Sequence, residues 1–215
     1  AFIEHSEDAI LGQLVKGDSM AVEATQRDAW LMQITILKEV LREQSAGSIY
    51  FEYVIPRLGR RIDAVLLLAG VVYVIEFKVG EAHFTRHALD QVVDYALDLK
   101  HFHEASHDLH VAPILVATQA RDMPLDITLD GHQDRMFKAV RATPATLGSA
   151  IQQVRDAVAA SDVHRQTWEN ARYCPTPPIV EAATALYGGH QVEDISRTDA
   201  GARNLTVPSA TVASI

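Results

Sequence analysis

Cysteine is almost absent from this sequence: Cys174 is the only one among 215 residues. A single thiol excludes an intramolecular disulfide and a metal site built from several thiolates. This composition is typical of proteins from a reducing compartment, and it predicts a cytoplasmic location. Cys174 also has no histidine close to it in the sequence, so the pattern does not indicate a nucleophile.

Long apolar runs and a targeting segment are missing too. The longest apolar run covers residues 64–75 and has 12 residues, whereas a helix needs about 20 to cross a bilayer. The N-terminus has no basic segment followed by an apolar one, which a secretion signal would require. We therefore expect no membrane insertion and no membrane partner.

Positive charge is scarce as well. The chain has 19 Lys and Arg residues and 28 Asp and Glu residues, which gives a formal net charge of -9. This balance excludes a protein that coats nucleic acid or anionic membranes by bulk attraction, but it leaves room for a local basic groove. Hydrophobic residues, by contrast, make up 48% of the chain, which is enough to bury a full core.

The spacing of the apolar residues predicts several helices and strands. Trp30, Ile34, Leu37 and Leu41 recur at steps of four, three and four, so they form one stripe of a helix over 26–44. The order of the expected helices and strands along the chain indicates an α/β or α+β fold with a central mixed sheet of four to five strands flanked by helices. The other elements that we expect are strands at 49–55, 62–68, 71–78, 111–117 and 136–140, and helices at 86–103 and 144–159.

The residue composition and the spacing of apolar residues divide the chain into three parts. Residues 1–25 suit an N-terminal helical arm, and residues 26–160 hold the periodic elements of one domain. Residues 161–215 are read as a connector, with an extended proline-rich segment at 173–178 and a short helix at 179–187. We expect this connector to lead to a further domain of a longer protein.

Two acidic residues border the most apolar part of the sequence. Asp63 and Glu76 enclose 12 residues, of which all except Gly70 are apolar or aromatic. A two-residue loop at 69–70 would pair positions that sum to 139, so Asp63 would lie opposite Glu76 in a central hairpin. Ala-Gly is not a preferred loop of this length, and a three-residue loop would separate the pair.

Opposed carboxylates on neighbouring strands repel each other unless a cation lies between them. Mg²⁺ suits this place, because it prefers oxygen ligands and needs only one or two protein carboxylates. Lys78 shares a face with Glu76 through the two-residue period of a strand, so its ammonium lies beside the same place. The simpler alternative is that both acids end their strands in solvent and that Lys78 neutralises one of them.

The residues around this pair resemble the PD-(D/E)XK nuclease superfamily, and within it the RecB-like branch. The motifs of that branch are an Asp on one strand, Glu-x-Lys on the next strand and Gln-x-x-x-Tyr on the following helix. Here they correspond to Asp63, to Glu76-Phe77-Lys78, and to Gln91 followed by Tyr95. The resemblance covers about residues 26–145 and implies a restriction-endonuclease-like core.

A narrower stretch, residues 51–63, is similar to the N-terminal segment of bacterial proteins that carry a P-loop ATPase or helicase-like module downstream. The chain itself has no Gly-x-x-x-x-Gly-Lys-[Ser/Thr] motif. The resemblance thus implies a metal-dependent nuclease that cuts nucleic acid, with DNA favoured over RNA, and a downstream P-loop ATPase as a partner domain.

The resemblance also implies a role for each motif residue. Asp63, Glu76 and the Phe77 carbonyl would hold one or two Mg²⁺ or Mn²⁺ ions, and Lys78 would orient the attacking water or stabilise developing charge. Gln91 and Tyr95, one helical turn apart, would form the pocket wall as catalytic residues, although an ordinary packed helix face would show the same pair.

The third metal ligand is left open by the sequence. Many members of the superfamily place a Glu on the first core helix, but here Glu39 and Glu43 project away from the apolar stripe. Gln33, on the edge of that stripe, is one candidate, and Glu52 on the first expected strand is the other.

Three arginines close to the acidic pair, Arg57, Arg60 and Arg61, are candidates for binding the nucleic-acid backbone. A solvated basic turn would have the same composition. Ten histidines also raise a zinc site as an alternative, but His83 and His87 lack the Glu of a zinc hydrolase helix.

Two other classes of function are compatible with the sequence. One is a nuclease-like module that binds nucleic acid or a partner without cutting and directs the downstream ATPase. The other is a dimerisation domain. An intact Asp, Glu and Lys set favours the enzyme, because a pure binding module has no need for opposed carboxylates that repel phosphate.

Overall fold

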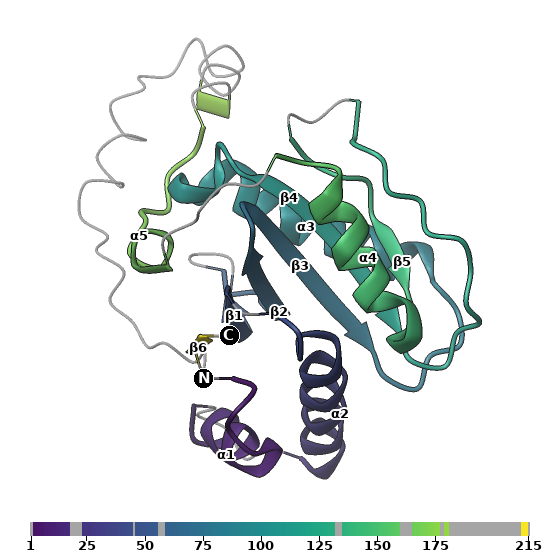
Figure 1. The fold of residues 1–215 in the computed structure, drawn as a ribbon. Coiled ribbons are helices and arrows are strands. Elements are labelled where there is room, and N and C mark those ends of the chain that lie inside the picture. Colours follow the sequence, from purple (N-terminus) through teal and green to yellow (C-terminus); the bar gives the residue numbers. More distant parts are fainter. Residues whose placement is uncertain are drawn as a thin grey trace.

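A mixed β-sheet forms the centre of the computed structural model (Figure 1). Its strands lie in the order β5-β4-β3-β2-β1-β6. The first three strands along the chain pair antiparallel, whereas β4 and β5 join parallel. The strands are β1 (Ser48–Val54), β2 (Arg61–Leu68), β3 (Val71–Lys78), β4 (His110–Ala117), β5 (Val140–Ala142) and β6 (Val212–Ser214). The predicted class, mixed α+β with a mixed sheet flanked by helices, is confirmed.

The structure describes residues 2–17, 23–44, 46–55, 59–131, 135–159, 165–176, 179–180 and 212–214. Their helices are α1 (Glu7–Gly17), α2 (Ala24–Val40), α3 (Arg86–Phe102), the short 3-10 helix η1 (Glu104–Ser106), α4 (Pro144–Asp156) and α5 (Arg165–Glu169), and residues 179–180 are helical as well. Among the described residues, no helix has both the length and the apolar character that crossing a bilayer requires. Most of the helix predicted at 179–187 lies outside these residues.

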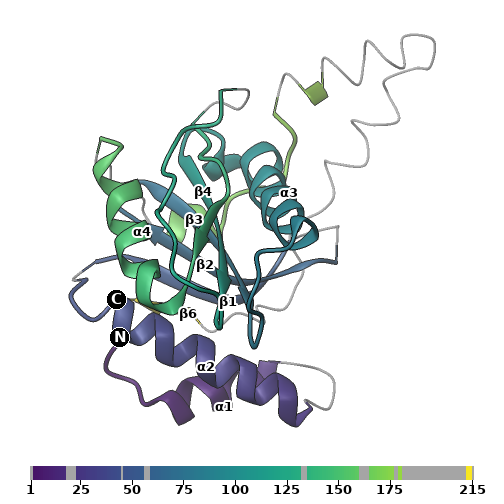
Figure 2. The same cartoon turned by 90° about the vertical axis from the view of Figure 1, so that its right-hand side faces the viewer.

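Helices cover both faces of the sheet (Figure 2). Odd-numbered positions of β3 such as Tyr73 and Ile75 pack with α2 and α4, whereas Val72 and Val74 pack with α3. This division follows from the two-residue period of a strand, which sends successive side chains to opposite faces. Both faces of β2 and β3 are therefore apolar, and the hairpin is the buried middle of the sheet.

The hairpin between β2 and β3 has the predicted register. Ala69 and Gly70 both adopt positive φ, at 50° and 82°, as a two-residue primed turn requires. Ala64 pairs with Ile75 and Leu68 with Val71, so paired positions sum to 139. The loop thus has two residues although Ala is unfavourable at positive φ, because the apolar pairs on both faces determine the register.

The predicted fifth strand is wrong in its position. We expected it at 136–140, but β5 covers Val140–Ala142, and Met136 and Phe137 form only isolated bridges. Both of these side chains are buried. A loop that sends consecutive apolar residues into the core has the same composition as a strand, which explains the error. The edge strand β6, which pairs with β1, was not predicted.

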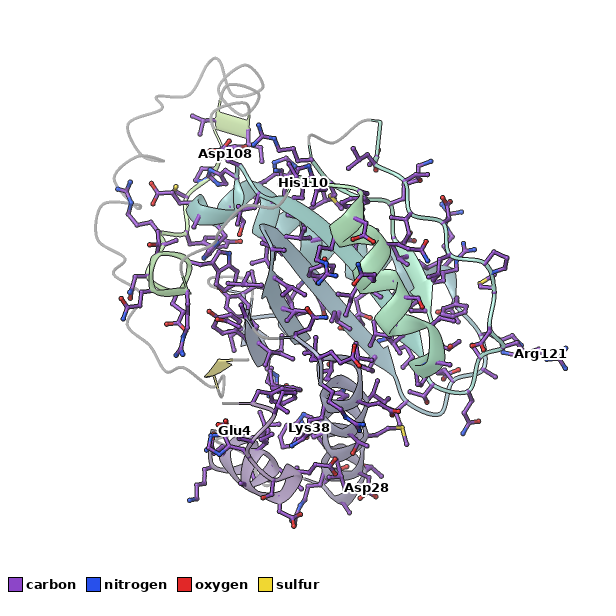
Figure 3. All side chains as sticks on the ribbon, in the orientation of Figure 1. Glu4, Asp28, Lys38, Asp108, His110 and Arg121 are labelled. Atoms are coloured by element: carbon purple, nitrogen blue, oxygen red, sulfur yellow. The ribbon has the colours of Figure 1, made fainter. Side chains whose placement is uncertain are left out.

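The N-terminal arm packs on α2. Ile10 and Leu14 of α1 are buried in the same cluster as Trp30 and Ile34. Lys38 on α2 donates to the backbone carbonyl groups of Ile3 and His5, and Figure 3 shows its side chain beside this N-terminal segment. The arm therefore holds the outer side of α2 in place.

Residues 165–176 of the predicted connector pack on the side of the sheet that α3 covers. Trp168 is fully buried, and its indole Nε1 donates to Ser106 Oγ at 2.9 Å. Ser106 Oγ also lies 2.8 Å from His103 Nδ1, and burial lowers the pKa of His103 to about 4. Residues 173–176 are extended and pair with the C-terminal end of α3, whereas residues 177 and 178 of the predicted extended segment lie outside the described residues.

The burial of Trp168 leads to a prediction about stability. Trp168→Ala should lower the free energy of unfolding by about 3–5 kcal/mol, because it leaves a large cavity and removes the donor to Ser106. Chemical denaturation followed by circular dichroism measures this. Thr167→Ala, at an exposed position of the same helix, is the matched control and should change stability little. Equal stability of the two variants would contradict the docking of α5.

Candidate functional site

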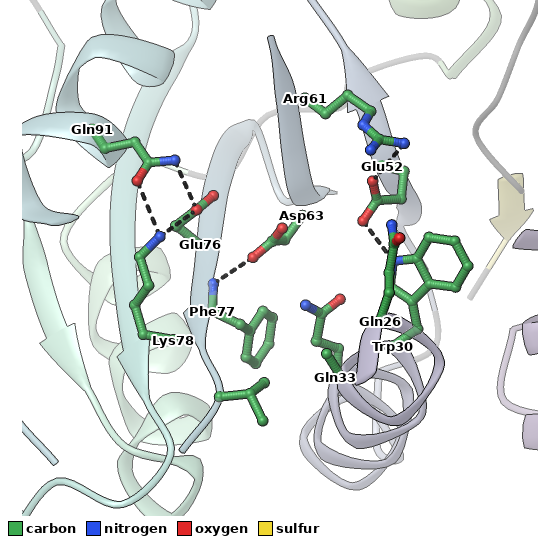
Figure 4. A pocket seen from close by; sticks show the side chains of 12 residues that line it. Gln26, Trp30, Gln33, Glu52, Arg61, Asp63, Glu76, Phe77, Lys78 and Gln91 are labelled. Carbon is green, nitrogen blue, oxygen red and sulfur yellow. Dashed lines mark hydrogen bonds and ion pairs between the residues drawn. The ribbon is translucent and has the colours of Figure 1, made fainter. Parts of the chain in front are cut away.

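A pocket of about 380 Å³ lies where the ends of β2 and β3 face α2 (Figure 4). The strands supply its charged side and α2 supplies an opposite wall of amide, aromatic and small side chains. One residue from α3, Gln91, also reaches it. The lining consists of Gln26, Ala29, Trp30, Gln33, Glu52, Arg61, Asp63, Glu76, Phe77, Lys78, Val79 and Gln91.

Three carboxylates occupy successive positions across β1, β2 and β3. Phe51 pairs with Ala64 and Tyr53 with Ile62, so Glu52 lies opposite Asp63. The register of the β2–β3 hairpin places Asp63 opposite Glu76. The pairing of β1 with β2 skips Glu52 and Asp63 and resumes at Tyr53 and Ile62, whereas the pairing of β2 with β3 ends at Ala64 and Ile75. The β2–β3 ladder therefore stops beside Asp63 and Glu76, and both residues line the pocket.

Asp63 replaces the missing ladder bond with its own side chain. Its Oδ2 accepts a hydrogen bond from the backbone N–H of Phe77 at 2.7 Å. Burial raises the pKa of Asp63 well above its ordinary range, and the nearby charge of Glu76 raises it further. The Phe77 N–H opposes this shift but does not cancel it. Near neutral pH this arrangement favours a bound proton or a bound cation at Asp63.

Glu76 uses one carboxylate oxygen and leaves the other without a partner. Oε1 accepts from Lys78 Nζ at 2.9 Å and from Gln91 Nε2 at 3.0 Å. Oε2 is buried and has no hydrogen-bond partner among the described residues. Glu76 is only 4% exposed, and burial raises its pKa although Lys78 acts in the opposite direction. An unpaired carboxylate oxygen in such a place suits a cation.

Gln91 connects the strand motif to α3. Its Oε1 accepts from Lys78 Nζ at 3.0 Å, and its Nε2 donates to Tyr95 Oη at 2.9 Å. Tyr95 is buried, stands one turn further along α3 and does not line the pocket. Tyr95 thus positions Gln91, whereas Gln91 and Lys78 line the pocket itself. Asp63, Glu76, Lys78 and Gln91 thus line one pocket, whereas Tyr95, which was predicted to form part of the wall, lies behind Gln91.

The wall from α2 contributes a second unpaired oxygen. Gln33 is 4% exposed, and its Oε1 has no hydrogen-bond partner within the described part of the chain. The apolar stripe had placed Gln33 at its edge, and the structure puts this side chain on the pocket side of α2 beside Phe77 (Figure 4). Gln33 is therefore better placed as an oxygen ligand than an ordinary surface glutamine.

Glu52, the other candidate for a third ligand, already has two partners. Its Oε1 accepts from the indole Nε1 of Trp30 at 2.7 Å, and its Oε2 lies 3.3 Å from Arg61 Nη1. Sequence reasoning treated Trp30 only as a core residue. Its buried indole N–H needed an acceptor, and that need is the signal that could have linked α2 to β1.

The three arginines separate in the structure. Arg61 lines the pocket beside Glu52. Arg60 points elsewhere, since its Nη1 lies 3.9 Å from carboxylates of Asp94 and Asp98 on α3. Arg57 lies outside the described residues. The described residues therefore do not form a clamp of three arginines. Of Arg60 and Arg61, Arg61 lines the pocket and Arg60 does not.

The donor set favours a hard cation over a soft one. Among the described residues, no group of three or more His, Cys, Asp or Glu side chains has the arrangement of a complete metal site. Oxygen atoms of Asp63, Glu76 and Gln33 nevertheless line one pocket, two of them unpaired and buried. This incomplete set fits Mg²⁺ or Mn²⁺, because such ions take one or two carboxylates and fill other positions with water.

No family model, no curated protein and no solved structure matches this chain. The resemblance to PD-(D/E)XK nucleases therefore stays a prediction, and a function has to be argued from the pocket.

The raised pKa of Asp63 leads to a prediction about pH. The folded chain keeps a proton on Asp63 that the unfolded chain releases near pH 4, so stability without metal should fall as pH rises from about 5 to about 9. Asp63→Asn removes this proton and can still accept from the Phe77 N–H. The variant should melt about 3 °C or more above the wild type at about pH 9 in EDTA, and nearly with it at about pH 4. Parallel melting curves at all pH values would contradict the burial of a titrating Asp63.

Proposed function

We propose that this chain is a metal-dependent nuclease that hydrolyses phosphodiester bonds of nucleic acid. The observation that carries the proposal is the buried, unpaired Oε2 of Glu76 beside Asp63 and Lys78. A carboxylate oxygen without a donor in a pocket of raised pKa values is destabilised until a proton or a cation occupies it, and the ion is the occupant that the proposal assigns.

The charges of the pocket support a phosphodiester as its ligand. Three carboxylates and the two cations Arg61 and Lys78 leave one net negative charge when all are ionised. A divalent ion changes that sum to one positive charge, which complements the single negative charge of a phosphodiester. The excess of acids over the whole chain is then no obstacle, because the field beside the substrate is local and set by the ion.

Asp63, Glu76, the Phe77 carbonyl and Gln33 would hold this ion, which is Mg²⁺ or Mn²⁺ in the proposal. When bound, the ion lowers the pKa of a water molecule and polarises the phosphate. Lys78, fixed between Glu76 and Gln91, places its ammonium where negative charge develops. Gln91 fixes that ammonium, and Tyr95 fixes Gln91.

The resemblance supports DNA over RNA as the substrate and a P-loop ATPase as the partner domain. These finer assignments rest on the motifs of residues 51–95 and on no contact in the pocket. Cytoplasmic action is part of the same proposal.

The activity test uses labelled single- and double-stranded DNA and RNA with Mg²⁺ or Mn²⁺. Wild type should release shorter fragments. Glu76→Ala and Lys78→Ala should each lower the rate by about 100-fold or more, because the first removes a ligand of the ion and the second removes the ammonium that stabilises developing charge. Glu81→Ala, at an exposed site outside the pocket, is the matched control. No cleavage above that of Glu76→Ala, with no heat on adding Mn²⁺, would reject the enzyme and favour a binding module.

A separate measurement tests the oxygen from α2. Gln33→Ala should weaken Mn²⁺ binding about tenfold in calorimetry, because an inner ligand or its oriented water is lost. Gln153→Ala on the exposed face of α4 should leave the affinity unchanged. Unchanged affinity in Gln33→Ala, with binding abolished by Asp63→Ala, would remove Gln33 from the ligand set and retain the rest.

A further inference from the structure

Two consecutive arginines at the start of β2 have different surroundings. Arg60 lies 3.9 Å from each of two carboxylates on the surface of α3, outside the pocket lining. Arg61 lines the pocket and lies 3.3 Å from Glu52. The side chain of Arg61 is 44% exposed although its partner is buried. Its guanidinium can therefore reach a ligand without any change of the backbone.

Glu52 is held in place more firmly than an ordinary surface partner. Its Oε1 accepts from Trp30, which is buried on α2, and its backbone adopts φ 49° in the middle of β1. This conformation is costly for a residue with a side chain, and it persists only where the surroundings compensate for it. The fixed carboxylate is thus a rigid partner for the guanidinium of Arg61.

Figure 4 shows the two cations of the pocket at opposite sides, with Asp63 between them. Lys78 stands on β3 beside Glu76, whereas Arg61 is held by Glu52 on β1. Neighbouring strands lie about 4.8 Å apart, so Glu52 and Glu76 are separated by roughly 10 Å. A ligand with two anionic groups joined by a spacer, such as successive phosphates of a nucleic-acid strand, can contact both cations at once.

We propose that Arg61 binds a backbone phosphate next to the one that is cleaved, and that Glu52 is the positioning residue that holds the guanidinium until this phosphate replaces its carboxylate. The proposal rests on the proposed function, and it names the substrate as a polynucleotide strand that spans the pocket. Arginine suits this role, because its planar guanidinium matches the oxygen atoms of a phosphate.

The test measures binding of a fluorescent single-stranded oligonucleotide by anisotropy in Ca²⁺ over a range of salt concentrations. Arg61→Ala should weaken binding about tenfold and lower the slope of log K against log salt by about 1, since one phosphate contact is lost. Arg60→Ala, which removes the same charge one residue away, should weaken binding less than about twofold. Melting curves check that both variants are folded.

A second variant keeps the test decisive if Arg61→Ala does not fold. Glu52→Gln retains an oxygen for the Trp30 indole and removes the charge that competes for Arg61, so it should tighten binding about threefold or more. Equal losses in Arg60→Ala and Arg61→Ala would overturn the proposal, and so would a polyglutamate peptide that binds through Arg61 as tightly as the oligonucleotide. Cleavage by wild type but not by Glu76→Ala would in that case leave the proposed function standing.

Discussion

Asp63 ends the backbone pairing of the central hairpin by accepting the Phe77 N–H with its side chain. A strand residue whose carboxylate replaces a carbonyl leaves the sheet open beside it, and this opening is the start of the pocket. The neighbouring positions of β1 and β3 carry Glu52 and Glu76, so the opening is lined by acids from three strands. Donors compensate for this concentration of negative charge: Trp30 and Arg61 at Glu52, and Lys78 and Gln91 at Glu76.

This row of three carboxylates lowers the stability of the fold. Its carboxylates lie in the middle of a sheet whose two faces are otherwise apolar. The turn side of the same hairpin compensates for this loss of stability, because its paired residues, such as Val65 and Val74, are buried. Stability and chemistry are thus divided along the same two strands: the turn end supplies the packing, and the open end supplies the charges.

Much of this arrangement could be predicted from the sequence, because it depends on local periods. The two-residue period of β2 and β3 placed Asp63, Glu76 and Lys78 on one face, and the helical period of α3 placed Gln91 and Tyr95 one turn apart. The role of Trp30 could not be predicted, since an indole on an apolar stripe is indistinguishable from a core residue until its acceptor is known. The different directions of Arg60 and Arg61 depend on the tertiary positions of Glu52 and α3. The position of β5 was predicted wrongly for a related reason, because a loop that buries Met136 and Phe137 has the same apolar composition as a strand.

The helix α3 belongs to two regions of the molecule at once. Its first half carries Gln91 and Tyr95, and its last turns and C-cap pack on Tyr173 and Trp168. With 17 residues it is about 25 Å long, and it is anchored along its length by buried residues such as Val92 and Leu99. The same rigid helix therefore carries both Gln91, which contacts the ammonium of Lys78, and the end that packs on Tyr173 and Trp168.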